Sequence, residues 1–255
     1  MKRFKLLACK VLYREICALT SKCENFIDVT YLQQGLHDTP DILRRTLQEQ
    51  IDLIDAGKDL FSCGLRESKD FDAILLGYGL CSNAICGISS KKYKIVIPKA
   101  HDCITLFLGS KEWYRQYFDE HNGGVFWYTP GWNECILMPG PERTEIKLKE
   151  YAEKYGEEDA EYLLAEESAW MKAYNTCTYV NWDELHMESH VEYTKTCAEY
   201  MNLKFDLLQG DPALMRDFID GNWPEDSFLI LEPGEEASQS YDEEVLMAKP
   251  ARYTP

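Results

Sequence analysis

Along the first part of the chain, the spacing of the apolar residues changes from that of a strand to that of a helix and back again. A run at 4–9 that is apolar except for Lys5 predicts a buried strand, and helical spacing of apolar residues at 11–19 predicts a helix after it. A second strand is predicted at 25–33. Thr39 and Pro40, residue types suited to a helix cap and to the first helical position, open a second helix. This alternation predicts a βαβα unit and a mostly parallel sheet.

Two further apolar runs occupy the middle of the chain, and each is followed by potential ligands. Strands are predicted at 71–77 and 94–98, the first running into GYGLCSN and the second into AHDC. Because ligands bind at the carboxyl ends of the strands in an open α/β sheet, we expect these two loops to meet at one edge. The first predicted strand delivers Cys9 to the same edge.

The second part of the chain keeps this alternation but changes in composition. Acidic residues dominate 139–172, where the spacing predicts one or two surface helices that join two halves. Further strands are predicted at 125–129, 177–182, 205–208 and 227–231. The polar, acidic tail from Pro233 onward is expected to be mobile or wrapped over the surface.

Together these patterns predict an α/β fold with mostly parallel, Rossmann-like sheets and helices on both faces. A likeness between FDAILLGYG and KFDLLQGDP suggests two related halves, although α/β units often share this much by chance. The predicted N-terminal α/β half is 1–138, which holds the cysteine and histidine loops. An acidic helical connector and a C-terminal α/β half are predicted for 139–255.

Composition narrows the classes of function. A chain of 255 residues with 45% hydrophobic residues can bury a core without disulfides. Its formal charge of −17 argues against nucleic acid, because phosphate binding needs concentrated Lys and Arg. The first hydrophobic run spans only six residues, too short for a signal peptide or a membrane span, so a cytoplasmic protein without a membrane partner is expected. In a reducing cytosol its 10 cysteines are expected to be thiols or metal ligands.

Cysteine and histidine gather at the ends of the predicted strands. Zinc and iron–sulfur centres are held by thiolates, sometimes with imidazole, that converge from several backbone segments. Cys9, Cys81, His101 and Cys103 meet this condition if their strands are neighbours. A CxxC pair is absent, and each cysteine taken alone is equally well explained by packing beneath a helix. The combination predicts a site for zinc or a 4Fe–4S cluster.

Glycines and carboxylates near these cysteines suggest further roles. Gly77 and Gly79 would let backbone amides approach a cofactor, although the pattern is not that of a nucleotide-binding loop. At a helix N-terminus the pKa of Cys81 is expected to be lowered, which favours the thiolate. Asp102 is a candidate catalytic acid or base, or alternatively the N-cap of the next helix. Glu15 is a second candidate acid or base, or alternatively a solvated residue of a helix face.

Aromatic and imidazole side chains mark two weaker candidates. Trp132 and Trp182 both follow predicted strands, so they are candidates for the wall of a cofactor pocket that takes a flat organic ligand. An ordinary hydrophobic lid explains them equally well. His186 and His190, spaced i and i+4, would share one helix face, but such pairs are more often incidental than metal-binding.

Four segments resemble the motifs of a known family. LLACKVLYREI, LLGYGLCSN, AHDCITLFLGS and the TPGW turn are similar to those of the uncharacterised domain of unknown function 1638 family, found in methanogenic archaea and anaerobic bacteria. The resemblance covers nearly the whole chain, and its motif positions are matched by Cys9, Glu15, Cys81, Asp102 and Cys103. It implies an α/β fold, strand-end cysteines and an association with corrinoid-dependent methyl-transfer systems. Lys10 departs from the family pattern, which often has glycine there.

Two functions from different classes are compatible with these features. The first is a metal-dependent enzyme of anaerobic one-carbon, methyl-transfer or sulfur metabolism, in which three thiolates hold zinc or a cluster and leave one position open for a substrate thiol. The second is a non-catalytic partner or chaperone of methyltransferase systems that binds a corrinoid or another metallocofactor. The expected partners are a small-molecule or cofactor ligand and a corrinoid protein or methyltransferase component.

Overall fold

The structure, a computed structural model, describes residues 1–58, 70–81, 83–242 and 244–251. Contacts within the chain group it into two compact units, Met1–Lys111 with Asp211–Pro255, and Glu112–Gly210. This division differs from the predicted boundary after residue 138, because the chain leaves the first unit, completes the second and then returns. The return depends on which strand the C-terminal segment pairs with, and a local pattern does not contain that information.

A five-stranded sheet with the order β2-β1-β3-β4-β8 forms the centre of the first unit. Its strands are β1 (Arg3–Cys9), β2 (Phe26–Leu32), β3 (Ala73–Gly77), β4 (Ile95–Pro98) and β8 (Phe228–Leu231). The first four are parallel, and β8 pairs antiparallel with β4. All residues of β3 and β4 are buried, as expected for parallel strands covered on both faces. The predicted α/β fold with mostly parallel sheets is confirmed.

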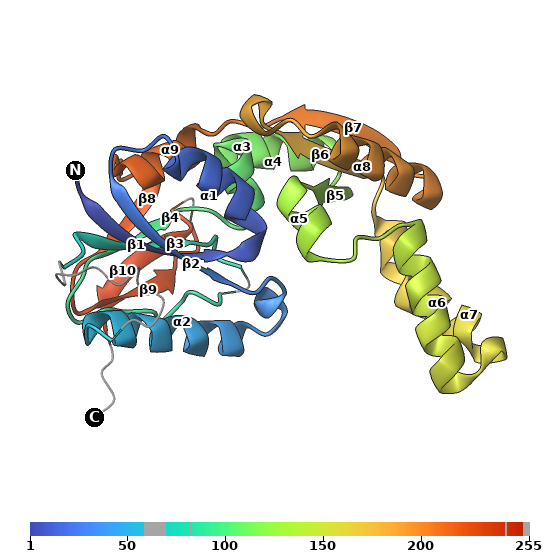
Figure 1. The fold of residues 1–255 in the computed structure, drawn as a ribbon, viewed down its shortest axis with the longest axis horizontal. Helices are drawn as coiled ribbons and strands as arrows, with labels where there is room; N and C mark the ends of the chain where they lie inside the picture. Colours follow the sequence, from blue (N-terminus) through green and yellow to red (C-terminus); the bar gives the residue numbers. More distant parts are fainter. Residues whose placement is uncertain (59–69, 82, 243, 252–255) are drawn as a thin grey trace. The chain divides into compact units, whose positions relative to one another are not determined.

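Helices cover both faces of this sheet (Figure 1). One face carries α2 (Pro40–Asp55), whose apolar residues recur at helical spacing and pack into the core: Leu43, Leu47, Ile51 and Ile54. The other face carries α1 (Tyr13–Thr20) and α9 (Ala213–Asp220) (Figure 1). Phe218 of α9 stacks on Phe228 of β8, with ring centroids 5.8 Å apart. Three short helices lie in the connections: η1 (Lys10–Leu12), η2 (Leu36–Asp38) and α3 (Ile104–Leu108).

The segment after β8 is an antiparallel hairpin, so the expectation of a mobile or loosely wrapped tail is wrong for its described residues. Its strands are β9 (Glu235–Gln239) and β10 (Leu246–Pro250). Ala237, Val245 and Leu246 are buried in the same core cluster as the inner face of α2. The hairpin forms because these few apolar side chains reach that core, although the segment is acidic overall.

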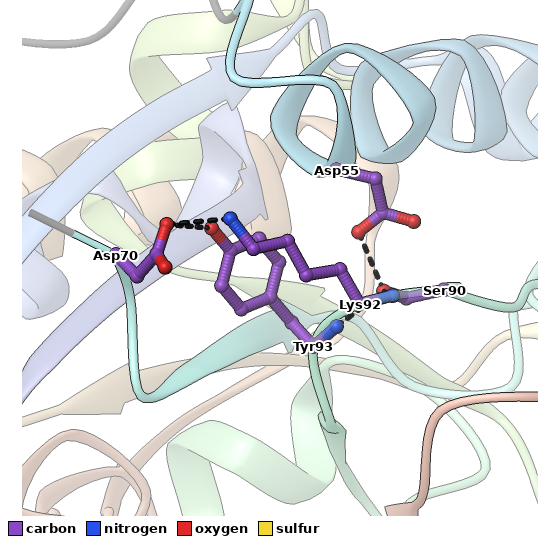
Figure 2. Close-up of polar contacts among 5 residues, drawn as sticks. All are labelled: Asp55, Asp70, Ser90, Lys92 and Tyr93. Atoms are coloured by element: carbon purple, nitrogen blue, oxygen red, sulfur yellow. Dashed lines mark hydrogen bonds and ion pairs between the residues drawn. The ribbon is translucent and has the colours of Figure 1, made fainter. Parts of the chain in front are cut away.

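A polar cluster holds the amino ends of β3 and β4, as Figure 2 shows. Asp55, the last residue of α2, accepts a hydrogen bond from Ser90 Oγ at 2.7 Å. Ser90 Oγ in turn accepts from the Tyr93 amide at 2.9 Å. Asp70 accepts from the Tyr93 hydroxyl at 3.0 Å and from Lys92 Nζ, and the hydrogen bond from Lys92 lowers the pKa of Asp70. These contacts lie at the strand ends opposite the cysteine loops, so they stabilise the sheet without entering the candidate site.

The second unit contains a three-stranded parallel sheet with the order β5-β6-β7. Its strands are β5 (Val125–Tyr128), β6 (Thr176–Asn181) and β7 (Lys204–Gln209). Helices connect them: α4 (Lys111–Glu120), α5 (Pro130–Cys135), α6 (Pro141–Tyr155), α7 (Glu157–Glu167), η3 (Ala169–Ala173), η4 (Asp183–Leu185) and α8 (Glu188–Met201). Tyr128, Cys177, Tyr179 and Cys197 lie at the centre of its core.

The acidic segment of the second unit forms α6 and α7, the surface helices that its pattern predicts. Of all their residues only Ala160 is buried, so the two helices pack mainly against each other. Across the described ranges, no helix is both long and apolar enough to cross a membrane.

Candidate functional site

Three neighbouring strands of the first unit each lead to a cysteine. Cys9 is the last residue of β1, Cys81 follows β3 by four residues, and Cys103 directly precedes α3 after β4. The strand order places β1 beside β3 and β3 beside β4, all parallel. Since β2 lies on one side of β1 and β3 on the other, the carboxyl ends of β1 and β3 flank a switch point, where doubly wound sheets bind ligands.

The loops after β3 and β4 are hydrogen-bonded to each other through their backbones. The Leu80 amide donates to the Ala100 carbonyl at 2.8 Å, and the Cys81 amide donates to the His101 carbonyl at 3.2 Å. Cys81 itself has a φ of 43°, a left-handed conformation that a non-glycine residue rarely adopts. The pairing therefore holds Cys81 in a strained conformation against the segment that carries Cys103.

Both glycines predicted to bind a cofactor have a packing role in the structure. A β-carbon on Gly77 would lie 2.8 Å from the β-carbon of Ala8, so this glycine lets β3 approach β1. A β-carbon on Gly79 would lie 2.6 Å from the carbonyl carbon of Asp102. Only a residue without a side chain allows the two loops to come this close. Cofactor binding by these glycines stays a prediction.

The thiols of the three loops act on one another electrostatically. Burial raises the pKa of Cys81 to about 12, with further contributions from the charges of Asp102 and Cys9. Hydrogen bonds from the backbone amides of Gly79 and Cys103 offset part of this rise. Burial also raises the pKa of Cys103 well above its ordinary value, and Cys81, Asp102 and Cys9 add to it. The expectation of a lowered pKa at Cys81 is therefore wrong, because no helix begins at this residue and burial disfavours the charged thiolate.

Tyr78 lies among these thiols and has a buried polar group that the sequence analysis did not select. Its side chain is 3% exposed, and its hydroxyl has no hydrogen-bond partner among the residues that the structure describes. Burial raises the pKa of Tyr78 well above its ordinary value, followed by the charges of Cys9 and Cys81. A buried hydroxyl without a partner is costly, so its position beside two thiols points to a ligand that accepts its proton in a hydrogen bond. The aromatic residue between the two glycines of GYG was the signal in the sequence.

Asp102 and His101 occupy different positions within the loop after β4. Asp102 Oδ1 accepts a hydrogen bond from the Ile104 amide at 2.9 Å, so the carboxylate caps the first turn of α3 as well as facing the thiols electrostatically. The side chain of His101 is exposed, and the residue is joined to the site by its backbone carbonyl, which accepts the hydrogen bond from the Cys81 amide. Ser82, the next residue of the predicted loop, lies outside the described residues.

Two other predicted residues lie in different surroundings. Glu15 is 2% exposed on α1 near Tyr31, whose pKa is raised mainly by burial, then by Cys17, and least by the charge of Glu15. Glu15 is therefore a buried residue of α1, and the alternative of a solvated residue on a helix face is wrong. Trp132 belongs to α5 of the second unit, where it packs against the core cluster of that unit. The expected helix face shared by His186 and His190 is wrong, because His186 precedes the first residue of α8.

The donor types at the strand ends suit a soft metal, but their positions are not those of a finished ligand set. Among the described residues, no group of three His, Cys, Asp or Glu side chains is arranged to hold a metal ion. Three thiols at one sheet edge nevertheless match the sulfur ligands of zinc and iron–sulfur centres. Holding a metal would require the thiols to lose protons and turn toward a common point.

The comparison with family models decides the family. A model described as "Protein of unknown function (DUF1638)" matches residues 31–219. The chain belongs to this family. In this DUF1638 protein the matched range contains Tyr78, Cys81, Asp102 and Cys103, whereas Cys9 precedes it. A search of curated proteins and a search of solved structures found no match. The DUF1638 description assigns no activity, so a function has to be argued from the chemistry of the site.

Proposed function

We propose that this protein binds zinc or an iron–sulfur cluster through Cys9, Cys81 and Cys103 and acts as a metal-dependent enzyme of anaerobic one-carbon, methyl-transfer or sulfur metabolism. The observation that carries the proposal is the position of Cys9, Cys81 and Cys103 at or after the carboxyl ends of three neighbouring parallel strands, β1, β3 and β4. Thiolates gathered this closely repel one another, and a bound cation removes that repulsion.

The chain's own groups supply the rest of the proposed chemistry. The amides of Gly79 and Cys103 donate to the sulfur of Cys81 and stabilise negative charge there. Tyr78 offers a buried hydroxyl to an acceptor atom of the substrate. Asp102, at the same edge, is the candidate acceptor for a proton that leaves a thiol. A bound zinc ion or cluster would supply Lewis-acid activation of a substrate thiol or leaving group.

A second candidate function is favoured by Tyr78. A non-catalytic partner of methyltransferase systems would bind a corrinoid or another metallocofactor that brings its own metal. Such a ligand needs hydrogen-bond donors and apolar contacts more than a preformed ligand set, and the unpartnered hydroxyl of Tyr78 is such a donor. Cys9 and Cys81, which act electrostatically on Tyr78, would then lie close to the bound cofactor.

Anaerobic purification, metal analysis and a visible spectrum test the proposal. A brown protein supports an iron–sulfur cluster, and a colourless protein with stoichiometric zinc supports activation of a thiol. A protein that binds no zinc or iron but takes up added cobalamin supports the second function. A protein that takes up neither metal nor cobalamin contradicts both.

Single substitutions identify the ligands. Cys9→Ser, Cys81→Ser and Cys103→Ser should each lower the metal content by at least about tenfold, because three sulfurs hold one centre. Cys17→Ser is the matched control, since Cys17 is an exposed thiol of α1 in the same unit. If metal content survives all three substitutions, these cysteines are not its ligands.

A further inference from the structure

The second unit has a cavity of its own at the ends of its parallel strands. The cavity has a volume of about 480 Å³, within the range of small-molecule sites. It is lined by residues of α5 and the segment after it, which follow β5, and by residues in the first turns of α8, which follows β6. Ligands of parallel α/β sheets bind at this end of the strands, so the position of the cavity is that of a binding site.

The polar groups of the cavity are mostly acceptors. Two carboxylates line it, those of Glu134 and Glu142, and Glu134 Oε1 lies 3.4 Å from His190 Nε2. The amide of Asn133 donates to the His190 carbonyl at 3.4 Å, while Asn133 Oδ1 is shielded from solvent and has no partner. An unpartnered carbonyl oxygen beside two carboxylates calls for a ligand that donates several hydrogen bonds.

The charges of the side chains that line the cavity indicate the charge of its ligand. None of the described residues that line the cavity is a lysine or an arginine. An anion would therefore face the two carboxylates of Glu134 and Glu142 with His190, which already contacts Glu134, as the one ionisable basic side chain among the described lining residues, whereas a cation would form charge-assisted hydrogen bonds with the carboxylates. Ile136 and Leu137 add an apolar wall.

We propose that this cavity binds a small organic compound with a primary ammonium group and a compact apolar body. The ammonium group donates to the carboxylate of Glu142 and to Asn133 Oδ1, and the apolar body contacts Ile136, Leu137 and the ring of Tyr193. An ammonium nitrogen carries three donors, so it can serve more than one of the acceptors that line the cavity. The proposal is independent of the thiol site, because it uses only residues of the second unit.

Cys135 provides a reporter inside the cavity. It lines the cavity and is partly exposed, whereas Cys17 in the first unit is exposed and outside it. The full chain is treated with iodoacetamide, and the alkylation rate of each cysteine is measured by peptide mass spectrometry. Benzylammonium should slow the alkylation of Cys135 by at least about fivefold at saturation and leave Cys17 unchanged. Benzyl alcohol and benzoate, which share its apolar body, are the neutral and anionic comparisons.

Two variants on the same helix separate the cavity from the general acidity of the protein. Glu142→Gln should raise the benzylammonium concentration for half-protection by about tenfold, because it removes one charged acceptor. Glu145→Gln is the matched control, since Glu145 pairs with Lys149 on the surface of α6 and does not line the cavity. Equal protection by benzoate, equal effects of the two variants, or no protection of Cys135 up to about 20 mM benzylammonium would overturn the proposal.

Discussion

The backbone of Asp102 lies so close to Gly79 that a β-carbon on Gly79 would come within 2.6 Å of it. This contact joins the loop that carries Cys81 to the loop that carries Cys103. Two backbone hydrogen bonds, from Leu80 and Cys81, run alongside it. The geometry of the thiol site therefore depends on a residue that has no functional group.

Gly79→Ala should lower the free energy of unfolding by about 2–3 kcal/mol, because the new methyl group can be accommodated only if one of two paired backbones moves. Gly57→Ala is the control: Gly57, unlike Gly79, has a positive φ, of 66°, and no described residue comes within 4 Å of its added β-carbon. Its cost should be about 1 kcal/mol, from backbone strain alone. Urea unfolding measures both values, and equal costs would show that the Gly79 contact is not tight.

The thiol of Cys81 predicts how stability changes at high pH. Its pKa rises from an ordinary value of 9.0 to about 12 on folding, so the native state keeps this proton after the unfolded chain has lost it. The contribution is fully present below pH about 9 and is lost as pH rises through about 12, so stability falls with pH in this window. Cys81→Ser should make that fall less steep, because serine does not titrate there.

The measurement for Cys81 is urea unfolding at several pH values between about 8 and 11. Cys17→Ser is the comparison, since it removes an exposed thiol and leaves the buried one in place. The free energy of unfolding of Cys17→Ser should change with pH in the same way as that of the original protein. A Cys81→Ser profile as steep as the other two would mean that the Cys81 thiol is not desolvated in solution.

Removing the hydroxyl of Tyr78 should not destabilise the ligand-free protein. The group is buried without a partner, so Tyr78→Phe should leave the free energy of unfolding unchanged or raise it by up to about 1 kcal/mol. Tyr117→Phe is the matched change, because the Tyr117 hydroxyl lies 2.9 Å from Thr178 Oγ1 and 2.6 Å from Asp206 Oδ2. It should cost about 1–2 kcal/mol.

Thermal and urea unfolding compare these two tyrosine variants, and cobalamin or metal binding shows what the Tyr78 hydroxyl does for a ligand. If Tyr78→Phe is as destabilising as Tyr117→Phe, the hydroxyl of Tyr78 has a partner within the protein. In Tyr78→Phe the stability of the fold should be kept while the affinity for cobalamin or metal drops, because the hydroxyl of Tyr78 is expected to bind a ligand and does not stabilise the fold.

A buried ion pair joins β1 to the edge strand β2 of the first sheet. Lys5 of β1 and Asp28 of β2 are register partners, their side chains are 0% and 6% exposed, and Nζ lies 3.3 Å from Oδ1. Asp28→Asn should lower the free energy of unfolding by about 3–5 kcal/mol, because it removes a negative charge that lies next to a buried lysine charge. The double variant Lys5→Met with Asp28→Leu should recover most of that loss. A double variant as unstable as the single one would contradict this account.

Local patterns were sufficient for the elements of the first unit. The strand at 4–9, the helix opened by Thr39 and Pro40, and the apolar runs at 71–77 and 94–98 all appear close to their predicted positions. Such patterns show which side of a helix or strand is buried, because the residues of that side recur at a fixed spacing along a short stretch of sequence. The acidic helices α6 and α7 were predictable for the same reason.

Other features required contacts between distant segments. The antiparallel pairing of β8 with β4 brings the end of the chain back to the first unit, and no local period encodes it. Tertiary packing also reversed the expected pKa shift of Cys81, because desolvation depends on everything packed around a sulfur.

The sequence by itself determined that cysteines would follow apolar strands, since strand ends and residue types can be read along the chain. Only the tertiary structure decided that β1, β3 and β4 are neighbours, which brings Cys9, Cys81 and Cys103 to one edge and places the Tyr78 hydroxyl among them. Strand order is set by long-range pairing and by the helices that cover each face, so a local pattern predicts the parts of this site and the fold alone assembles them.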